Sequence, residues 1–245
     1  MRIAIVSDIH GNLPALEAVA RDFKRRGVDA VVNLGDSLSG PLFPLETAQY
    51  LMAQSWVHLA GNHERQLLTQ KPGQWSAPDE FTHSRLSSRE LEWLSSLKPC
   101  TQFSSDVFLC HGTPKSDMEY FLETVEPTGA RAATLREVDA RLGEVKTALV
   151  ACGHTHYPRS VRSSTGQLII NPGSVGLPAF DDNHPYPHVI ETGSPDARYA
   201  IVEQYSGNWS AMLISISYDH KAMAKLAQAR QMPDWACALT SGYMS

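Results

Sequence analysis

The first sixty residues alternate between short apolar runs and amphipathic segments, and this alternation restricts the fold more than any other feature of the chain. Apolar runs rich in β-branched residues occupy 2–6, 29–34 and 56–60, and each is typical of a strand buried on both faces. Apolar residues recur at helical spacing in 16–26 and 45–54, which predicts a helix after each of the first two strands. Successive strand-helix units predict a parallel sheet with right-handed crossovers, whose ligands bind beyond the carboxyl ends of the strands.

Further along the chain, the pattern changes from strand-helix units to hairpins. Apolar runs at 106–110 and 148–152 predict two more buried strands, with a helix around 135–142 between them. From Ser160 onward the runs are short and separated by turn residues, such as Ser-Gly-Asn at 206–208. We therefore expect a second, largely antiparallel sheet. The predicted fold is an α/β four-layer αββα sandwich, with a mainly parallel sheet packed on a second mixed or antiparallel sheet.

The sequence shows none of the features that usually separate domains. Its 245 residues show no internal repeat, low-complexity tract or linker composition, so we expect a single domain over residues 1–245. Residues 66–97 interrupt the strand-helix alternation and include a predicted helix in SSRELEWLSSL, so we expect an excursion over the site that shapes substrate access. The tail from about Asp219 is predicted to be helical.

The composition argues against several classes of protein. Hydrophobic residues make up 42% and charged residues 19%, which is an ordinary globular balance. A formal net charge of -5 disfavours a stable nucleic-acid partner held by a broad cationic face, but is compatible with phosphate chemistry through metal ions. No apolar run approaches the roughly 20 residues of a membrane span, and no secretory leader is recognisable, so we expect no membrane association and a cytoplasmic location. The four cysteines form no CxxC pair and are expected to be reduced thiols.

Polar side chains directly follow five of the predicted strands, beginning with the stretch SDIHGN at 7–12. The polar residues at these strand ends are Asp8, His10, Asp36, Asn62, His63, His111, His154 and His156. Taken singly, each element has an ordinary explanation, since Asp8 alone could cap a helix and the others could form turns. Five such elements in order after five predicted strands are poorly explained by chance, so we interpret them as one site.

Carboxylate, amide and imidazole groups at one sheet edge form a mixed nitrogen and oxygen ligand set. Such a set suits Mn, Fe, Zn, Co or Ni better than Mg or Ca alone, and thiolate-rich structural zinc is not indicated. The ligands exceed the need of one ion, so two divalent or transition metal ions are predicted. Two ions about 3.5–4 Å apart activate water and hold both oxygens of an in-line phosphoryl displacement.

These elements resemble the motifs of the calcineurin-like metallophosphoesterases. The matching stretches are DIHGN at 8–12, GD at 35–36, GNHE at 61–64, HG at 111–112 and GHTH at 153–156. The loop INPGSVG at 170–176 is similar to the closing segment of the compact prokaryotic branch, which includes phosphodiesterases and dinucleoside-polyphosphate hydrolases. The resemblance extends to about Glu203. For INPGS we favour a structural role as a tight loop beneath the site over direct contact with substrate.

The resemblance implies a role for each motif residue. The residues implied for one ion are Asp8, His10 and His156, those for the other are Asn62, His111 and His154, and Asp36 is the implied bridge. A hydroxide held between the ions is the implied nucleophile. His63 would face the phosphate and either stabilise its developing charge or protonate the leaving oxygen. Glu64 stands where the family more often has Asp, a departure that bears on how His63 is oriented.

Three further residues are candidates for contact with the substrate. Asn12 ends the first motif and is expected on the substrate side or beside the metal ligands. Arg65 directly follows the third motif, and its guanidinium suits a bidentate contact with phosphate. His83 lies within the excursion and is the one histidine outside the motifs that we retain as a candidate.

The predicted function is that of a dinuclear metal-dependent phosphoester hydrolase, most simply a phosphodiesterase acting on a nucleotide-like or other small phosphodiester. Phosphomonoesterase or serine/threonine protein phosphatase activity is an alternative, as is a non-catalytic metal-binding scaffold like the retromer subunit with this fold. All motif ligands and His63 are present, which favours an enzyme over a scaffold. A nucleotide-cofactor domain is disfavoured because no GxGxxG follows the first strand. The sequence indicates neither the natural substrate nor the native ion nor the oligomeric state.

Overall fold

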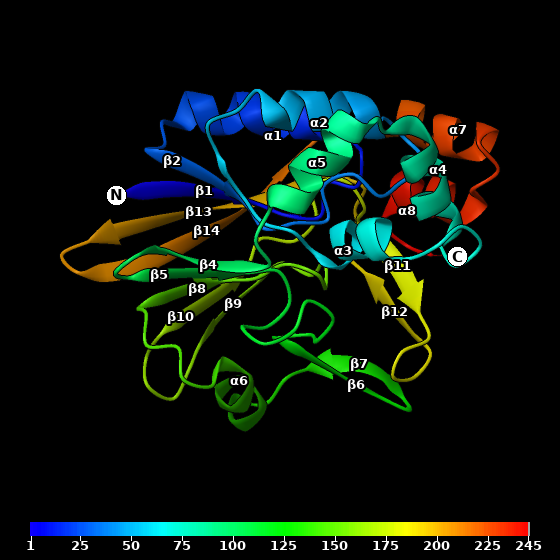
Figure 1. The fold of residues 1–245 in the computed structure, drawn as a ribbon. Coiled ribbons are helices and arrows are strands. Elements are labelled where there is room, and N and C mark those ends of the chain that lie inside the picture. Colours follow the sequence, from blue (N-terminus) through cyan, green and yellow to red (C-terminus); the bar gives the residue numbers. More distant parts are fainter. Residues whose placement is uncertain (245) are drawn as a thin grey trace.

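Two five-stranded β-sheets form the centre of the molecule (Figure 1), and the computed structural model describes residues 1–244. The first sheet has the order β14-β13-β1-β2-β3 and consists of β1 Arg2–Val6, β2 Ala30–Asn33, β3 Val57–His58, β13 Ala197–Tyr205 and β14 Asn208–Ile216. The second has the order β4-β5-β8-β10-β9 and consists of β4 Cys100–Ser104, β5 Val107–Cys110, β8 Leu149–Ala151, β9 Arg159–Arg162 and β10 Leu168–Asn171. The predicted α/β class with two sheets is confirmed.

Each sheet combines parallel and antiparallel pairs. Strands β1, β2 and β3 pair in parallel, and β13 and β14 extend this sheet in antiparallel fashion. Strands β5, β8 and β10 also pair in parallel, and β4 and β9 are the antiparallel edges of the second sheet. Since the three parallel strands of each sheet end at one edge, the loops that follow them meet at the same end of the molecule.

The final hairpin differs from the sequence-based expectation. We expected β13 and β14 in the second sheet, but β13 pairs with β1 in the first, with Ile3 opposite Val202. The physical reason is that residues 197–202 are buried without alternation, which requires neighbours on both edges and packing on both faces. The second sheet is correspondingly less antiparallel than expected, and its edge strand β4 was not predicted.

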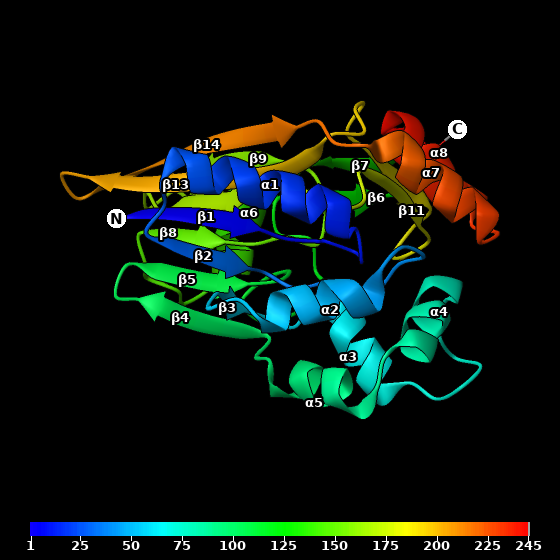
Figure 2. The ribbon, with the colours of Figure 1, turned by 90° about the horizontal axis from the view of Figure 1, so that it is seen from above.

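Apolar layers lie between the sheets and outside each of them. Between the sheets, Ile5 and Val32 of the first pack with Leu109 and Ile170 of the second. The outer face of the first sheet is covered by α1 Leu13–Arg26 and α2 Pro44–Met52, as Figure 2 shows from above. Outside the second sheet, α6 Leu135–Leu142 packs on β5, β8 and β10. This arrangement places the strand-end loops against a rigid core.

Helices and hairpins gather around the carboxyl ends of the strands. The elements near this end are α3 Asn62–Thr69, α4 Ala77–Arg85, α5 Ser88–Ser96, α7 His220–Ala229, α8 Pro233–Ser241 and the hairpin of β11 Ala179–Asp182 with β12 His188–Glu191. A second small hairpin joins β6 Glu123–Glu126 to β7 Gly129–Ala132. In Figure 1 the helices α3, α4, α7 and α8 and the β11–β12 hairpin lie at the end of the molecule opposite the N-terminus. They form the walls around the polar strand ends.

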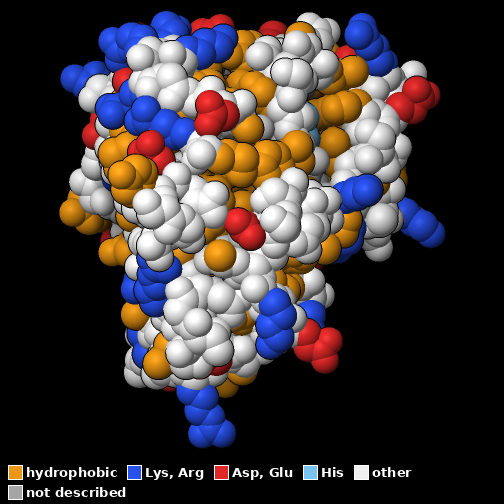
Figure 3. Space-filling model, turned by 90° about the vertical axis from the view of Figure 1, so that its left-hand side faces the viewer, with side chains coloured by type: hydrophobic (Ala, Val, Ile, Leu, Met, Phe, Trp, Pro, Cys, Tyr) orange, Lys and Arg blue, Asp and Glu red, His pale blue; other side chains and the backbone are white. Residues whose placement is uncertain are grey.

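The basic triplet Lys24-Arg25-Arg26 ends α1, as predicted, and lies far from the polar strand ends. Figure 3 shows the face opposite to these walls, where Lys and Arg side chains gather along the upper edge.

Within residues 1–244, none of the helices combines the length and apolar character that crossing a membrane requires.

Candidate metal centre

The polar residues at the strand ends have an unusual backbone conformation. Asp8, His10, Asp36, His154 and His156 have φ angles of 55, 53, 51, 68 and 56°, all in the left-handed region. For a residue other than glycine this conformation costs about 1–2 kcal/mol, and it persists only where the surrounding structure holds it. Within the described chain, only two other non-glycine residues have positive φ values. Strain is therefore concentrated where the sequence analysis placed a site.

Hydrogen bonds between the loops hold this conformation. The backbone N–H of Asp8 donates to Gly35 O at 3.0 Å, that of His10 donates to Asp36 O at 3.0 Å, and that of Gly153 donates to His111 O at 2.6 Å. Gly35 has a φ of 110°, and a Cβ there would lie 2.5 Å from Gly61 N. The loops thus cross so closely that a glycine is required.

Asp8, His10 and His156 form a first cluster of buried side chains with ligand atoms in reach of one another. The Nδ1 atoms of His10 and His156 lie 2.7 and 2.8 Å from backbone carbonyl oxygens, so each Nδ1 carries a proton and donates it. The two Nε2 atoms face each other at 3.1 Å. Because burial and the neighbouring His156 lower the pKa of His10 to about 3, the Nε2 of His10 presents a lone pair to this contact.

The carboxylate of Asp8 completes this cluster. Its Oδ1 is buried without a hydrogen-bond partner and lies 3.4 Å from His156 Nε2, whereas Oδ2 accepts from the backbone N–H of His154 at 3.2 Å. Although burial opposes ionisation, the charge of His156 keeps the pKa of Asp8 below its usual value. The unpartnered Oδ1 of Asp8 and the Nε2 atoms of the two imidazoles converge on one position, and such a set of atoms fits a cation.

Asp36, His111 and His154 form a second cluster. His111 Nδ1 donates to Leu34 O at 3.0 Å, and its Nε2 lies 3.1 Å from both Asp36 Oδ2 and Asn62 Oδ1. His154 Nε2 donates to Met118 O at 3.1 Å, which leaves Nδ1 as its free nitrogen. Asn62 is therefore the amide that joins this cluster.

The charges in the second cluster favour a cation there as well. Burial lowers the pKa of His111, but the Asp36 carboxylate outweighs this effect and raises it to about 10. Burial likewise opposes ionisation of Asp36, yet the charges of His111 and His63 hold the pKa of Asp36 well below its usual range. The position between these residues thus attracts positive charge strongly, and both clusters offer nitrogen and oxygen donors suited to divalent ions.

His63 stands beside the second cluster and is oriented by a residue from another helix. Its backbone N–H donates to Asp36 Oδ1 at 3.0 Å, and its Nδ1 lies 2.9 Å from Asp79 Oδ1 on α4. Asp79 is 2% exposed and also accepts hydrogen bonds of 2.6 Å from the hydroxyls of Ser39 and Ser76. Burial opposes protonation of His63, but the Asp36 charge and the Asp79 hydrogen bond raise its pKa to about 9.

An open cavity of about 690 Å³ lies over both clusters. Asp36, His154 and His156 line it from the strand ends, and His63 and Trp75 line it from the helical segment. Further walls come from Gln66, Gln70, Gln74, Ser76, Asp79, Met118, Leu177, Phe180, Asp181, Asp182 and His184. No Lys or Arg within residues 1–244 is among the lining side chains. Metal ions would therefore be the main source of positive charge in the cavity.

Comparison with known proteins identifies the family. The sequence profile of the calcineurin-like phosphoesterase superfamily domain matches residues 1–192. The chain belongs to this superfamily.

The similarity to known proteins extends over almost the whole length of this chain. The crystal structure of a metallophosphoesterase from Sphaerobacter thermophilus is 25% identical, with a TM-score of 0.78 over 99% of this chain and 100% of that one. The hypothetical protein PH1004 from Pyrococcus horikoshii is 17% identical and shares the fold, with a TM-score of 0.74 over 100% of this chain and 99% of that one. The uncharacterized protein MJ0912 of Methanocaldococcus jannaschii is 25% identical over 259 residues, which cover 95% of this chain and 94% of the relative. Family membership makes this protein a phosphoester hydrolase of the metallophosphoesterase type.

Two of the predicted substrate contacts do not reach the cavity of the phosphoesterase. Asn12 is fully buried, caps α1, and donates from Nδ2 to Gly176 O and Tyr218 Oη at 2.9 Å each. Arg65 forms a bidentate ion pair with Asp117, with Nε–Oδ2 and Nη2–Oδ1 distances of 2.6 and 3.0 Å. Neither side chain lines the cavity, because each is committed to contacts within the protein. Asn12 thus has a structural position at the start of α1, beside the loop that carries Asp8 and His10.

His83 is connected to the cavity only through its neighbour. Its ring stacks on that of Trp75, with centroids 4.2 Å apart and planes 26° apart. Trp75 lines the cavity and His83 does not. The imidazole thus supports an aromatic wall of the phosphoesterase.

Two acidic residues have roles that sequence patterns did not reveal. Glu64 does not contact His63 through a hydrogen bond; it accepts from the backbone N–H groups of Gly61, Asp36 and Ser37 at 2.7–2.8 Å. Asp79 takes the orienting position beside His63 instead. It is the third residue of α4 after the cap Ser76, where an acidic residue is ordinary, so the sequence carries no signal for this role.

The INPGS loop has the structural role that we favoured. Asn171 Nδ2 donates to Gly153 O at 2.7 Å, and Ser174 Oγ donates to Asp8 O at 2.7 Å. A Cβ on Gly176 would overlap the carbonyl oxygen of Ile9. The loop therefore braces the backbone that carries the first and last motifs.

Proposed function

We propose that this phosphoesterase is a phosphodiesterase that uses two divalent cations to hydrolyse a nucleotide-like or other small phosphodiester. The observation that carries the proposal is the pair of buried clusters, in which carboxylate oxygens and imidazole nitrogens converge. Asp8, His10 and His156 would hold one ion, and Asp36 would contact both. Asn62, His111 and His154 would hold the other ion. The donor chemistry fits Mn, Fe, Zn, Ni or Co.

Two bound ions would supply Lewis-acid activation of a water nucleophile and neutralise charge on the phosphoryl group. The protein positions these charges before substrate binds, because the loops that carry the ligands are bonded to one another. His63 acts from beside the clusters. Its Nδ1 donates to Asp79, which leaves the Nε2 proton for the phosphate or the departing oxygen. Asp79 thereby holds the imidazole in one orientation and stabilises its charge.

The charges that line the cavity favour a phosphodiester as substrate over a compound with several negative charges. A diester carries one negative charge at neutral pH, whereas a monoester carries up to two and a polyphosphate more. Asp181 and Asp182 line the cavity, and Arg65, which directly follows the GNHE motif, is paired with Asp117. Additional phosphate groups would therefore face acidic side chains, and none of the lining residues in the described chain is a Lys or Arg that could bind them.

Hydrolysis of bis(p-nitrophenyl) phosphate and p-nitrophenyl phosphate tests the proposal directly. Purified protein should turn over both esters with added Mn²⁺, with higher kcat/KM for the diester, and should lose activity after chelation. Activity should return when metal is restored. A preference for the monoester would make the protein a phosphomonoesterase, and the absence of turnover with two ions bound would support a scaffold.

A further inference from the structure

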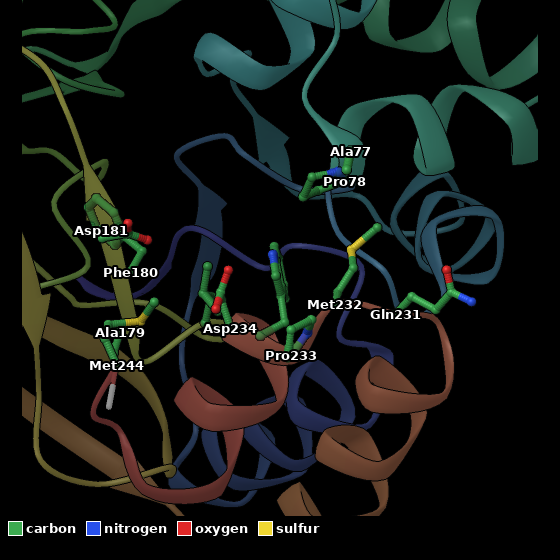
Figure 4. A pocket seen from close by; sticks show the side chains of 12 residues that line it. Ala77, Pro78, Ala179, Phe180, Asp181, Gln231, Met232, Pro233, Asp234 and Met244 are labelled. Atoms are coloured by element: carbon green, nitrogen blue, oxygen red, sulfur yellow. The ribbon is translucent and has the colours of Figure 1, made fainter.

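A second cavity of about 270 Å³ opens beside the one that holds the metal clusters. Figure 4 shows how it lies between the start of α4, the strand β11 and the turn that leads into α8. Leu177, Phe180 and Asp181 line both cavities, so the two are adjacent. We call the smaller cavity the side slot. The side slot thus lies where a group attached to a phosphate over the metal clusters could reach it.

The side slot is mainly apolar. Ala77 and Pro78 come from α4, and Met232, Pro233 and Trp235 come from the region of α8, as Figure 4 illustrates for most of them. A closed apolar cavity of about 150 Å³ suffices to take up benzene, so the side slot has room for an aromatic ring. Asp181 and Asp234 are its charged residues, and no cation in residues 1–244 lines it. Its chemistry therefore favours an uncharged apolar group over a second phosphate.

Trp235 connects the side slot to the metal clusters. Its ring packs edge-on against the imidazole of His10, with centroids 5.7 Å apart and planes 77° apart. Residue 40 is glycine, and a Cβ there would lie 2.8 Å from the ring of Trp235. Helix α8 lies beyond residue 192, where the match to the family profile ends. The C-terminal tail thus adds a wall to the site from outside the residues that the family profile matches.

We propose that the side slot binds one alcohol arm of the phosphodiester and selects an uncharged apolar or aromatic group, with Trp235 as a specificity-determining residue. This inference rests on the proposed phosphodiesterase function. The substrate is therefore a diester with a single phosphate, one of whose arms presents a ring or a short hydrocarbon group to the side slot. The other arm remains in the larger cavity beside Trp75.

Two model diesters with the same leaving group test the side slot. Methyl p-nitrophenyl phosphate and phenyl p-nitrophenyl phosphate both release p-nitrophenolate, and they differ only in the arm that would enter the side slot. The measured quantity is the ratio of kcat/KM for the phenyl ester to that for the methyl ester, with the full chain loaded with Mn²⁺. Intrinsic reactivity cancels when this ratio is compared between variants and the wild type.

Two variants fill the side slot from opposite sides, Ala77→Phe on α4 and Met232→Trp at the start of α8. Each should lower the ratio about tenfold, because a hydrophobic pocket discriminates by about 10- to 200-fold per methylene group it accepts or excludes. Ser84→Phe is the matched control, since Ser84 is an exposed residue of α4 outside the side slot, and it should keep the wild-type ratio. Thermal unfolding shows whether each variant is folded.

The outcomes separate the two proposals. A lower ratio in both filled variants, with the control unchanged, supports the side slot. An unchanged ratio in both folded variants overturns it while leaving the phosphodiesterase function intact. Failure of the metal-loaded wild type to hydrolyse either ester overturns the proposed function itself, and the side slot as a substrate subsite with it.

Discussion

The floor and the walls of the cavity are built on different physical principles. The floor consists of the strand-end loops with Asp8, Asp36 and His154, which are buried, left-handed and joined by backbone hydrogen bonds. The walls come from α3, α4, the β11–β12 hairpin and α8, and include exposed residues such as Asp181. The floor allows one geometry for its ligands, whereas wall residues from different helices meet through side chains, as His63 and Asp79 do. Changes in the floor should therefore affect metal binding, and changes in the walls should affect turnover or specificity.

The largest effect is expected at the centre of the floor. Asp36→Asn should lower the content of both ions together and reduce turnover by more than about 100-fold. Replacing even a residue that only hydrogen-bonds to a metal ligand lowers metal affinity or activity by about 10- to 100-fold. Elemental analysis and kinetics of the purified variant measure the two effects. Glu17→Gln removes an exposed carboxylate on α1 and should change neither quantity. Normal content of one ion in the Asp36 variant would contradict its bridging position.

A smaller and different effect is expected at the boundary between floor and walls. His63→Ala should reduce kcat by about 10²–10³-fold, the usual effect of removing a group that acts on developing charge, while metal content stays near normal. His83→Ala removes an imidazole that does not line the cavity and should have little effect on kcat. Loss of both ions in the His63 variant would mean that His63 belongs to the metal-binding floor.

Asp79 belongs to the walls and acts on the chemistry only through His63. Asp79→Asn should reduce kcat by about tenfold, at the lower end of the range for residues that orient a functional group, with normal metal content. The same change should have little additional effect in a His63→Ala background, because the two residues share one interaction. Glu80→Gln, its exposed neighbour on α4, is the matched control. Additive losses in the double variant would rule out a role through His63.

The smallest effect is expected outside the cavity. Arg65→Ala breaks an ion pair with Asp117 in which the Arg65 side chain is 47% exposed, and such pairs contribute about 0–1 kcal/mol. The variant should unfold at nearly the same temperature and should keep its KM within about twofold. A large increase in KM would instead show that Arg65 leaves Asp117 to bind phosphate.

Local patterns predicted the elements that carry the floor. The apolar runs at 2–6 and 148–152 became β1 and β8, because buried parallel strands are continuous runs of apolar residues. The polar residues at the ends of these strands could be recognised from the sequence, because they directly follow the apolar runs. That Asp8, His10 and His156 share one cluster was implied by the family resemblance, and the structure brings them together although β1 and β8 belong to different sheets.

The walls could not be predicted in the same way. The contact between His63 and Asp79 joins α3 to α4, and that between His10 and Trp235 joins residues at opposite ends of the chain. Nothing in the spacing of these residues indicates a contact. The assignment of β13 and β14 to the wrong sheet has the same origin, because periodicity predicts strands but not their neighbours.

The left-handed backbone of the ligands implies that the fold would be more stable without its chemistry. Replacing His156 by glycine or by alanine removes the same imidazole, and the two variants differ in how freely the backbone adopts a φ of 56°. Glycine adopts it without the cost of about 1–2 kcal/mol that alanine bears. His156→Gly should therefore melt at a higher temperature than His156→Ala, the reverse of the order found inside a helix or strand. The difference between the two melting temperatures would then indicate the cost in folding free energy of the left-handed backbone at this position.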